Sequence, residues 1–399
     1  MIDIGSGTLT KSGSGTLTLS GPNTYTGTTT VSAGTLALGA NDVISNSSAL
    51  SVNGGTLALG SYSDTVGAVT IGISGGSITS TTGVLTGSSY TFNNTSAATV
   101  SAILAGSVNL TQAGSGTTTL SGANTYSGSN TLNGGTLALS GNGTLGSTAN
   151  NLTMSATAAL DLQRALTVGN LVMATGNTIT NSTGSSSLTV GGTSSLGGSI
   201  TTSGNQTYAG ATTIAANTSL TSTANGTITF SSTVNSASAA TYSLTTSTGT
   251  GSTVFASTVG ASYALASLNT SGDTSIGGSV TTAGVQGYGG NLVLTTSDIS
   301  LNTTNSDVTV AGDISTAGAG VGGIIKFLGT GNYAYSSNAG VSYTNYTVGS
   351  GSQAPGISIS YSSGSYTWTS SISGTIDYLI VAGGGGGGGS DGGGGGAGG

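Results

Sequence analysis

Hydrophobic positions alternate with small polar positions in short runs along most of the chain. In residues 15–21, GTLTLSG, and residues 34–39, GTLALG, successive Leu residues are separated by one Thr or Ala. A period of two places the Leu side chains on one face of a strand and the small polar side chains on the other. Gly, Asn and Ser between the runs supply turn conformations that larger residues resist. The pattern therefore predicts many short strands.

The strand pattern recurs with a regular period. Leu17, Leu36 and Leu57 hold equivalent places in successive copies, and the phrase GTLAL occurs at 34–38, 55–59 and 135–139. A repeat of about 20 residues fits one coil of a parallel β-helix, with Leu stacked on Leu inside and Thr on Thr outside. We expect roughly 16 such coils between residue 1 and about residue 320.

Two longer self-similarities support the solenoid. Residues 12–39 and 113–140 are identical at 18 of 28 positions. Residues 195–210 and 275–290 agree at 10 of 16 positions. The offset between this second pair is about four coils of about 20 residues each, so we expect the solenoid to continue through this region with a different surface texture.

The composition changes after about residue 320, where Tyr becomes dense and the only Trp, Trp368, occurs. Residues 356–371, GISISYSSGSYTWTSS, predict one or two amphipathic strands, and 376–382, IDYLIVA, a short apolar strand. We therefore expect four segments. They are a β-helix of one repeat type (1–165), a β-helix of a second type (166–320), a Tyr-rich β segment (321–382) and a glycine-rich tail (383–399).

The composition excludes several classes of protein. The chain has 399 residues, 74 of them Gly, and only 3% are charged, against about 25% in an ordinary globular domain. The lack of Glu argues against helices. Three basic residues cannot form a nucleic-acid patch, and no apolar run approaches the ~18 residues of a membrane span. Disorder is the alternative for so Gly- and Ser-rich a chain, above all in the tail, but a mean hydropathy of +0.21 is unusual for it.

The N-terminal residues Met1–Ile4 lack the basic start and apolar run of a signal peptide. The absence of Cys suits a secreted chain and a cytosolic one equally. Together with the repeats, this leads us to expect a fragment of a longer protein, whose export signal and membrane anchor lie outside this sequence.

The repeats resemble known families of bacterial surface proteins. GSGTLTLSGPNTYTGTTTVSAGTLALG, within residues 12–39, and its copy at 113–140 resemble the autotransporter-associated β-strand repeat of autotransporter passengers. The 195–237 region is similar to repeats of filamentous-haemagglutinin-like adhesins, and the segment from Tyr366 into the glycine tract is similar to a glycine-rich terminal domain. The resemblance implies a right-handed parallel β-helix (β-solenoid), secretion, and a role in adhesion, aggregation or biofilm. It supplies no catalytic residues.

Few residues here carry chemistry. Without His or Cys there is no imidazole base, thiol nucleophile or usual zinc site. GISGG at 72–76 matches a nucleophile elbow at Ser74, but a triad needs a His. Residues 141–146 and 318–323 match Gly-x-Gly-x-x-Gly, which chance produces at this Gly content, and neither is expected to open a helix. We predict no catalytic, cofactor-binding or metal-binding residues.

The carboxylates give the best enzyme hypothesis. Ten Asp residues are mostly isolated, and the densest group is Asp298, Asp307 and Asp313. Stacked coils could bring two of them within reach, as a glycosidase or lyase requires, or they could hold Ca²⁺. The alternative, which we favour, is that they are turn residues that keep the protein soluble. Asp391 stands alone in the glycine tail, without the repeat of calcium-binding β-rolls.

Two further binding hypotheses concern Tyr and Thr. Tyr25, Tyr126, Tyr208 and Tyr288 hold matching places in the repeats. Stacked tyrosines could line a carbohydrate-binding face, but we favour rings half buried over a coil corner with the hydroxyl in water. Ice recognition by Thr-x-Thr ladders would need a regular Thr ladder along one face. Residues 8–10 and 16–18 fit the local motif, but they are not one coil apart.

The sequence thus predicts a non-enzymatic adhesin or structural protein at the extracellular surface of a Gram-negative bacterium. Its expected partners are host or bacterial surface glycans or proteins, and copies of itself through solenoid ends or the glycine-rich tail. Nucleic acid is not expected, and a membrane only through an anchor outside the chain. One alternative is a fibre, matrix or phage tail-fibre component acting through the glycine-rich end; another is a β-helix carbohydrate-active enzyme.

Overall fold

The computed structural model describes residues 1–238, 240–296, 299–304 and 306–316, and the backbone of six later strands. The described residues form strands and no helix. They make a parallel β-solenoid of about 14 turns, so the predicted fold class is confirmed. The chain divides into two compact units, residues 1–204 and 205–399. The predicted boundaries of the four segments stay predictions.

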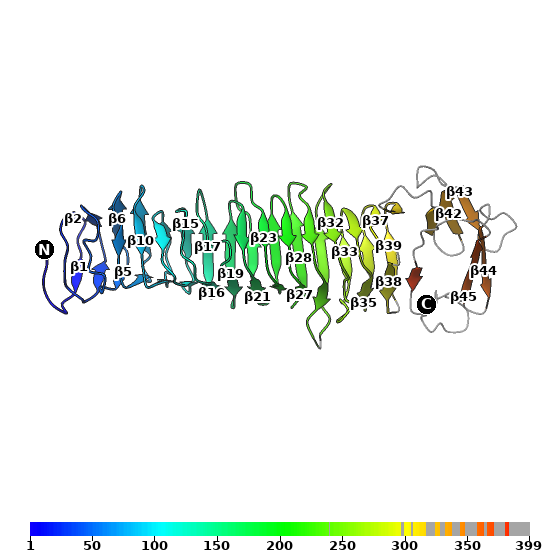
Figure 1. Cartoon of the computed structure of the whole chain (residues 1–399), viewed down its shortest axis with the longest axis horizontal. Helices are drawn as coiled ribbons and strands as arrows, with labels where there is room; N and C mark the ends of the chain where they lie inside the picture. Colours follow the sequence, from blue (N-terminus) through cyan, green and yellow to red (C-terminus); the bar gives the residue numbers. More distant parts are fainter. Residues whose placement is uncertain are drawn as a thin grey trace. The chain divides into compact units, whose positions relative to one another are not determined.

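Each coil of the first unit crosses two long parallel sheets (Figure 1). Sheet A contains β1 (Leu9–Lys11), β3 (Thr29–Val31), β5 (Leu50–Val52), β8 (Ala68–Ile71), β11 (Ser89–Phe92), β14 (Leu110–Gln112), β16 (Asn130–Leu132), β18 (Leu152–Met154), β21 (Leu171–Met173) and β24 (Ser194–Leu196). Sheet B contains β2 (Thr16–Leu19), β4 (Thr35–Leu38), β6 (Thr56–Gly60), β9 (Gly76–Ser80), β12 (Ala98–Val100), β15 (Thr117–Leu120), β17 (Gly135–Leu139), β19 (Ala158–Leu162), β22 (Thr178–Thr180) and β25 (Ser199–Thr202).

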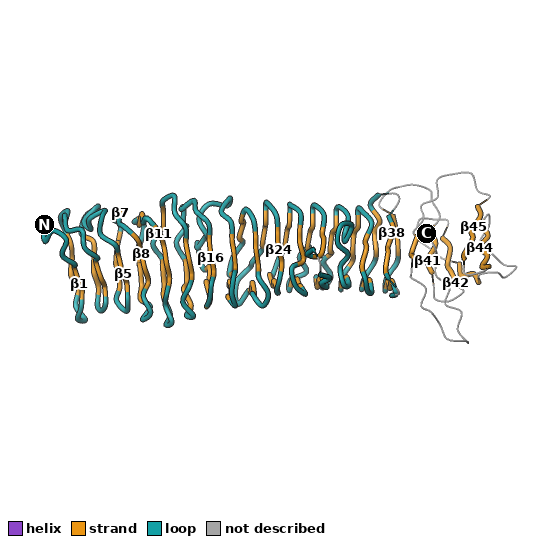
Figure 2. The backbone as a smooth tube through the Cα atoms, turned by 90° about the horizontal axis from the view of Figure 1, so that it is seen from below, coloured by secondary structure: helices purple, strands orange, loops and turns teal. Residues whose placement is uncertain are grey.

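A third side of the first unit is formed by shorter strands. They are β7 (Asp64–Thr65), β10 (Val84–Thr86), β13 (Ile103–Ala105), β20 (Leu166–Val168) and β23 (Leu188–Val190). Loops join the sides at the coil corners (Figure 2).

The leucine ladder predicted from the sequence forms in sheet B. Leu17 pairs with Leu36, Leu36 with Leu57, and Leu57 with Ile78. From Leu36 onward these side chains are fully buried, while Leu17 is 37% exposed. Stacking one inward residue on the next removes each from water on both sides, which supplies the main stabilisation of a solenoid.

The coils of the first unit vary in length. In sheet A, Ser51 pairs with Thr70, whereas Val172 pairs with Ser195 across a longer stretch of chain. The extra residues are accommodated at corners, because a change within a strand would turn its inward side chains outward. Longer coils are the reason that the solenoid has about 14 turns rather than the roughly 16 expected.

The second unit has the same three-sided plan. One sheet contains β26 (Gln206–Tyr208), β29 (Ile228–Phe230), β32 (Ser252–Phe255), β34 (Asp273–Ile276), β37 (Leu292–Leu294) and β40 (Ile314–Thr316). The next contains β28 (Thr218–Ser222), β31 (Leu244–Ser247), β33 (Leu268–Thr270), β36 (Gln286–Tyr288) and β39 (Val308–Val310). The third side contains β27 (Thr212–Ile214), β30 (Val234–Ser236), β35 (Val280–Thr282) and β38 (Ser300–Thr303).

An aromatic column fills part of the second unit. The rings of Tyr208 and Phe230 stack with centroids 5.0 Å apart, and those of Phe230 and Phe255 with centroids 5.1 Å apart. All three are buried and occupy paired positions of β26, β29 and β32. The separation of neighbouring coils is close to the distance at which aromatic rings stack, so each ring contacts the ring of the next coil.

Six later strands are described by their backbone. β41 (Ile324–Phe327), β42 (Asn332–Ser336) and β43 (Thr344–Thr347) form an antiparallel sheet, and β44 (Ile357–Ser362) and β45 (Ser365–Ser370) an antiparallel pair. β46 (Ile380–Ala382) pairs parallel with β38. Strands are therefore present within the predicted segments 356–371 and 376–382, and residues 376–379 lie outside the described residues. The glycine-rich tail, 383–399, lies outside the described residues.

Candidate functional site

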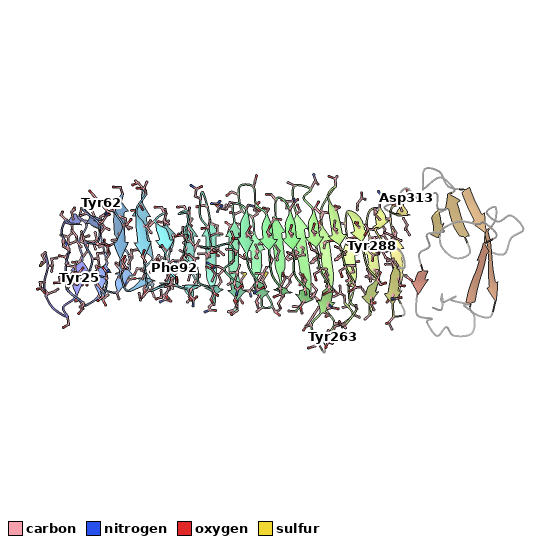
Figure 3. The ribbon with its side chains drawn as sticks, in the orientation of Figure 1. Tyr25, Tyr62, Phe92, Tyr263, Tyr288 and Asp313 are labelled. Atoms are coloured by element: carbon pink, nitrogen blue, oxygen red, sulfur yellow. The ribbon has the colours of Figure 1, made fainter. Side chains whose placement is uncertain are left out.

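The four repeat tyrosines lie inside the solenoid units. Tyr25, Tyr126, Tyr208 and Tyr288 each expose at most 1% of their surface, and Figure 3 shows Tyr25 and Tyr288 within the ribbon. The hypothesis of a tyrosine-lined carbohydrate face is therefore wrong. The expectation of half-buried rings with the hydroxyl in water is wrong as well, because protein groups bind each hydroxyl.

In the first unit the tyrosine hydroxyls bind side chains four positions later. Tyr126 donates a hydrogen bond to Asn130 Oδ1 over 2.5 Å, and the Tyr25 and Thr29 hydroxyls lie 2.7 Å apart. Burial raises the pKa of Tyr25 and of Tyr126 above the usual value for a tyrosine. A neutral hydroxyl that is hydrogen-bonded in the interior is a structural group.

In the second unit the tyrosines use a different partner. Tyr208 donates to Gln206 Oε1 over 2.9 Å, and Tyr288 donates to Gln286 Oε1 over 3.0 Å. The two copies of this Gln-x-Tyr motif lie in different sheets, in β26 and β36. The offset between the copies is therefore not the four whole coils expected from the sequence, because most of the coils between them are longer than 20 residues.

The candidate carboxylates do not form a described site. Asp298 lies outside the described residues, and Asp307 and Asp313 are exposed. Asp313 occupies a corner position, where its backbone N–H donates to Asn291 Oδ1 over 2.9 Å. Asn291 in turn donates its own N–H to Asp273 Oδ1 over 2.8 Å. These hydrogen bonds place Asp273, Asn291 and Asp313 in one stack at the starts of β34, β37 and β40.

The other sequence motifs also occupy turns. Ser74 is exposed, and its backbone N–H donates to Asn53 Oδ1 over 2.8 Å. Residues 141–146 form a coil corner that opens no helix. Residues 318–323 lie outside the described residues. The structure thus gives neither motif within the described residues the surroundings that its chemistry needs.

A buried carboxylate that sequence analysis missed is Asp64, which is 1% exposed. Its Oδ2 accepts hydrogen bonds from the backbone N–H groups of Val43 and Ile44, each over 3.0 Å, while Oδ1 has no partner. The pKa of Asp64 is raised to about 6, mainly by burial and to a smaller extent by the nearby Asp42, while these two hydrogen bonds lower it. Asp64 pairs with Leu85 in the neighbouring strand, so a carboxyl replaces an apolar side chain in this column.

The most regular surface of the first unit is the outer face of sheet A. Successive middle positions of its strands are paired in register. These residues are Thr10, Thr30, Ser51, Thr70, Thr91, Thr111, Thr131, Thr153, Val172 and Ser195. They are partly or fully exposed, and no hydrogen bond among the described residues uses the hydroxyl of any of the first eight. The column therefore presents free donors and acceptors to solvent.

The flanking outward positions of sheet A differ from the central column. One flank carries Thr8, Thr28, Ala49, Ala68, Ser89, Asn109, Ser129, Asn151, Asn170 and Thr193. The other carries Ser12, Ser32, Asn53, Gly72, Asn93, Ala113, Asn133, Ser155, Ala174 and Gly197. None is charged. The face has a single Thr column, not the paired Thr-x-Thr columns of the ice-recognition hypothesis.

Sheet B has a shorter hydroxyl column, in which Thr16, Thr35, Thr56, Ser77, Thr99 and Thr119 are paired in turn. The Ser77 and Thr99 hydroxyls bind each other at 2.8 Å. After Thr119 the column continues through Ala138 to Asp161. Burial raises the pKa of Asp161, but hydrogen bonds from Ser182 and Gln163 outweigh this and lower it overall. Residues 8–10 and 16–18 thus begin columns in different sheets.

Two features are absent from the described ranges, a group of metal-binding side chains and a membrane-spanning helix. No group of three or more His, Cys, Asp or Glu side chains is placed to hold a metal ion in those ranges. No helix there is long and apolar enough to cross a membrane.

Comparison with protein families gives one match. Residues 9–38 and 110–139 match the model of the passenger-associated-transport-repeat. The matched segments include the two copies of the longer repeat and both leucine phrases of each. No curated protein and no solved structure was found to match the chain significantly. The repeat family and the β-solenoid together indicate a passenger-like repeat protein.

Proposed function

We propose that this chain is a non-enzymatic, adhesin-like structural protein, secreted to or displayed at the surface of a Gram-negative bacterium. The observation that carries the proposal is the pair of passenger-associated-transport-repeat matches, which fall on regular coils of a β-solenoid. Stacked coils of similar sequence present the same surface residues again and again, which gives an extended surface for binding. Surface glycans or proteins of host or bacterial cells are the partners that fit this role.

The placement of the polar residues supports a structural role. The repeat tyrosines are hydrogen-bonded inside the solenoid units, and Asp273 and Asp313 belong to a stack at the starts of neighbouring strands. The carbohydrate-active enzyme alternative has no described carboxylate pair in its favour. The alternative that acts through the glycine-rich end falls on residues outside the described ranges.

An attachment assay tests the proposal. The full chain is coupled to beads through its N-terminus, and the beads are mixed with bacterial and epithelial cells. Retention well above that of beads carrying a heat-unfolded sample supports the adhesin role. Retention equal to that control, with the β-sheet circular dichroism spectrum of the coupled protein intact, overturns it. Incubation with a panel of polysaccharides tests the enzyme alternative, because new reducing ends would appear only with hydrolysis.

A further inference from the structure

We propose that Asp64 is a proton-dependent link between coils: its protonated Oδ1 donates a hydrogen bond to the carbonyl oxygen of Leu85 in the next coil, and ionisation breaks that bond and opens the third side of the first unit locally. The inference goes beyond the proposed function and does not depend on it, because it concerns contacts between coils and not what the surface binds.

Two buried asparagines show how a side chain on this side joins the coil before it to the coil after it. Asn124 Oδ1 accepts the backbone N–H of Leu104 over 2.9 Å, and its Nδ2 donates to the carbonyl oxygen of Thr144 over 2.8 Å. Asn23 Oδ1 accepts a backbone N–H 21 residues earlier, and its Nδ2 donates to the carbonyl oxygen of Val43 over 2.6 Å. Each amide therefore uses one acceptor and one donor, on opposite sides of its coil.

Asp64 holds the same place in this column. Its Oδ2 accepts the N–H of Val43 over 3.0 Å, as Asn124 Oδ1 accepts that of Leu104. Asp64 pairs with Leu85, and Leu85 pairs with Leu104 in the same sheet. The Oδ1 of Asp64 therefore takes the place of an amide Nδ2, which is a donor at the other two positions.

A donor is needed at this place. Asp64 is 1% exposed, and its Oδ1 has no partner among the described residues. The corresponding carbonyl of the next coil is that of Leu85, which accepts the hydroxyl of Tyr90 over 2.7 Å and has a second lone pair. A protonated carboxyl can donate to it, whereas an ionised one would leave two buried acceptors facing each other.

The groups around Asp64 favour the proton. The pKa of Asp64 is raised to about 6, mainly by burial and to a smaller extent by Asp42, an exposed carboxylate before the segment that binds Oδ2. Burial also raises the pKa of Tyr25 in the preceding coil and of Tyr90 in the following one, so both hydroxyls stay neutral. The Lys11 ammonium donates to backbone carbonyl oxygens instead. The Asp64–Leu85 hydrogen bond should therefore form below about pH 6 and be lost above it.

The opening should be local. Asp64 lies in β7, which has only two residues and belongs to a sheet of three strands, whereas sheets A and B continue through the same coils with longer ladders. Segments with few backbone hydrogen bonds open at a lower free energy than the rest of a protein. Ionisation should therefore separate β7 from β10 while sheets A and B stay paired.

Hydrogen exchange of the full chain, followed by mass spectrometry at about pH 5 and about pH 8, tests the proposal. The rates are corrected for the intrinsic effect of pH on amide exchange. In the wild type we expect the protection of β7 and β10 to fall at least about tenfold at the higher pH, while sheets A and B keep theirs. Asp64→Asn supplies the amide donor of the other two positions, so it should keep β7 and β10 protected at both pH values.

Two further variants distinguish a titrating link from a merely structural carboxyl. Asp42→Asn removes a nearby negative charge, so β7 and β10 should lose protection at a lower pH than in the wild type. Asp161→Asn is the matched control, because Asp161 accepts hydrogen bonds from Ser182 and Gln163 in another sheet. It should leave the pH dependence of β7 and β10 unchanged.

A reciprocal variant tests the equivalence of the positions. Asn124→Asp places a carboxyl where Asn124 Nδ2 now donates to Thr144. We expect β13, which contains Leu104, to acquire a loss of protection at the higher pH that the wild type does not show there. A variant that folds at about pH 5 but not at about pH 8 would support the proposal in the same way, and pH-independent protection of β13 would count against it.

Infrared spectra test the proton and its hydrogen bond directly. The difference between the wild type and Asp64→Asn at about pH 5 should contain the C=O band of a protonated carboxyl, at the lower frequency of a hydrogen-bonded acid, and the band should disappear at about pH 8. The absence of this band overturns the proposal. So does protection of β7 and β10 that is independent of pH in the wild type, or that falls equally in Asp64→Asn.

Discussion

A single buried carboxyl group makes the stability of this solenoid depend on pH. Asp64 lies in an inward column beside Leu85, with one carboxylate oxygen bound by two backbone N–H groups and the other unpaired. Burial therefore favours the protonated form of this side chain in the folded state.

The first prediction concerns stability against pH. The folded-state pKa of Asp64 is about 6 and its usual value 3.8. The folded state therefore holds the proton more tightly, so this contribution to stability is complete below about pH 4 and is lost as the pH rises through 6. Two pKa units correspond to no more than about 3 kcal/mol.

Asp64→Asn keeps an oxygen for the Val43 and Ile44 N–H groups but cannot ionise. We expect urea unfolding to show the variant more stable than the wild type at pH 7.5, by up to about 3 kcal/mol, and equal to it at pH 4. Equal stability of the two proteins at both pH values would show that the carboxyl does not ionise with a raised pKa.

The second prediction concerns a buried hydroxyl. Tyr126→Phe removes the donor to Asn130 Oδ1 and leaves that oxygen buried without this hydrogen bond. We expect a loss of about 1–2 kcal/mol of unfolding free energy. Tyr62, which is 36% exposed, provides the control, and Tyr62→Phe should change stability by less than about 0.5 kcal/mol. Thermal melts followed by circular dichroism would measure both.

At the scale of one coil, the backbone of the preceding coil limits the choice of residue. Gly34 and Gly135 precede the Leu phrase in the two passenger-associated-transport-repeat segments, and both have a φ of +59°. A Cβ on Gly135 would lie 2.3 Å from the carbonyl oxygen of Gly116, and one on Gly34 would lie 2.4 Å from that of Gly13. Both repeats therefore need glycine here for conformation and for space.

The third prediction follows from these turns. Gly135→Ala should lower the unfolding free energy by more than about 2 kcal/mol, since it adds left-handed strain to a clash with backbone. Gly15→Ala is the control, because no heavy atom lies within 4 Å of its added Cβ and its φ is not positive. That change should be neutral or slightly stabilising. Hydrogen exchange would show whether the loss of protection is confined to the coils next to Gly135. Loss of protection throughout the chain would contradict the view that each coil is stabilised only by its neighbours.

Strand register was predictable from the sequence, but the position of the corners was not. Leu17, Leu36 and Leu57 stack as predicted, because a period of two fixes which face is inward. The lengths of the corners follow no period. The sequence therefore could not predict the number of coils, or that Tyr208 and Tyr288 lie in different sheets. Asp64 was missed because a two-residue strand, Asp64–Thr65, has no pattern to identify it.

For the whole chain, stability should be a sum over coils instead of the property of one core. Thr117 pairs with Thr136 and Thr118 with Leu137, so residues 118–136 form one coil repeat. Deleting them joins Thr117 to Leu137 and gives GSGTLALSG, which matches the phrase GSGTLTLSG at 13–21 at eight of nine positions.

The fourth prediction is that the chain folds without residues 118–136. We expect a β-sheet circular dichroism spectrum and a melting temperature within about 5 °C of the wild type, because only one set of nearest-neighbour contacts is lost. Deletion of residues 118–127 alone should prevent folding of the adjoining coils, because it removes half a coil and misaligns the sides. If the chain without residues 118–127 folds, the corners can absorb the loss of half a coil without misaligning the strands.

The parallel register also determines how the first unit responds to force. A pull applied to the two ends of this unit loads the backbone ladders of a terminal coil before those of any other coil. Each rupture frees one coil of about 20 residues, which stretches to roughly 70 Å at about 3.4 Å per residue. The unit would then lengthen in nearly equal steps at nearly equal force, and each released coil could reform on its neighbour when the load falls. A molecule of this kind that tethers a cell in flowing liquid would respond to a sudden rise in force by unfolding one coil at a time, so that its attachment is kept.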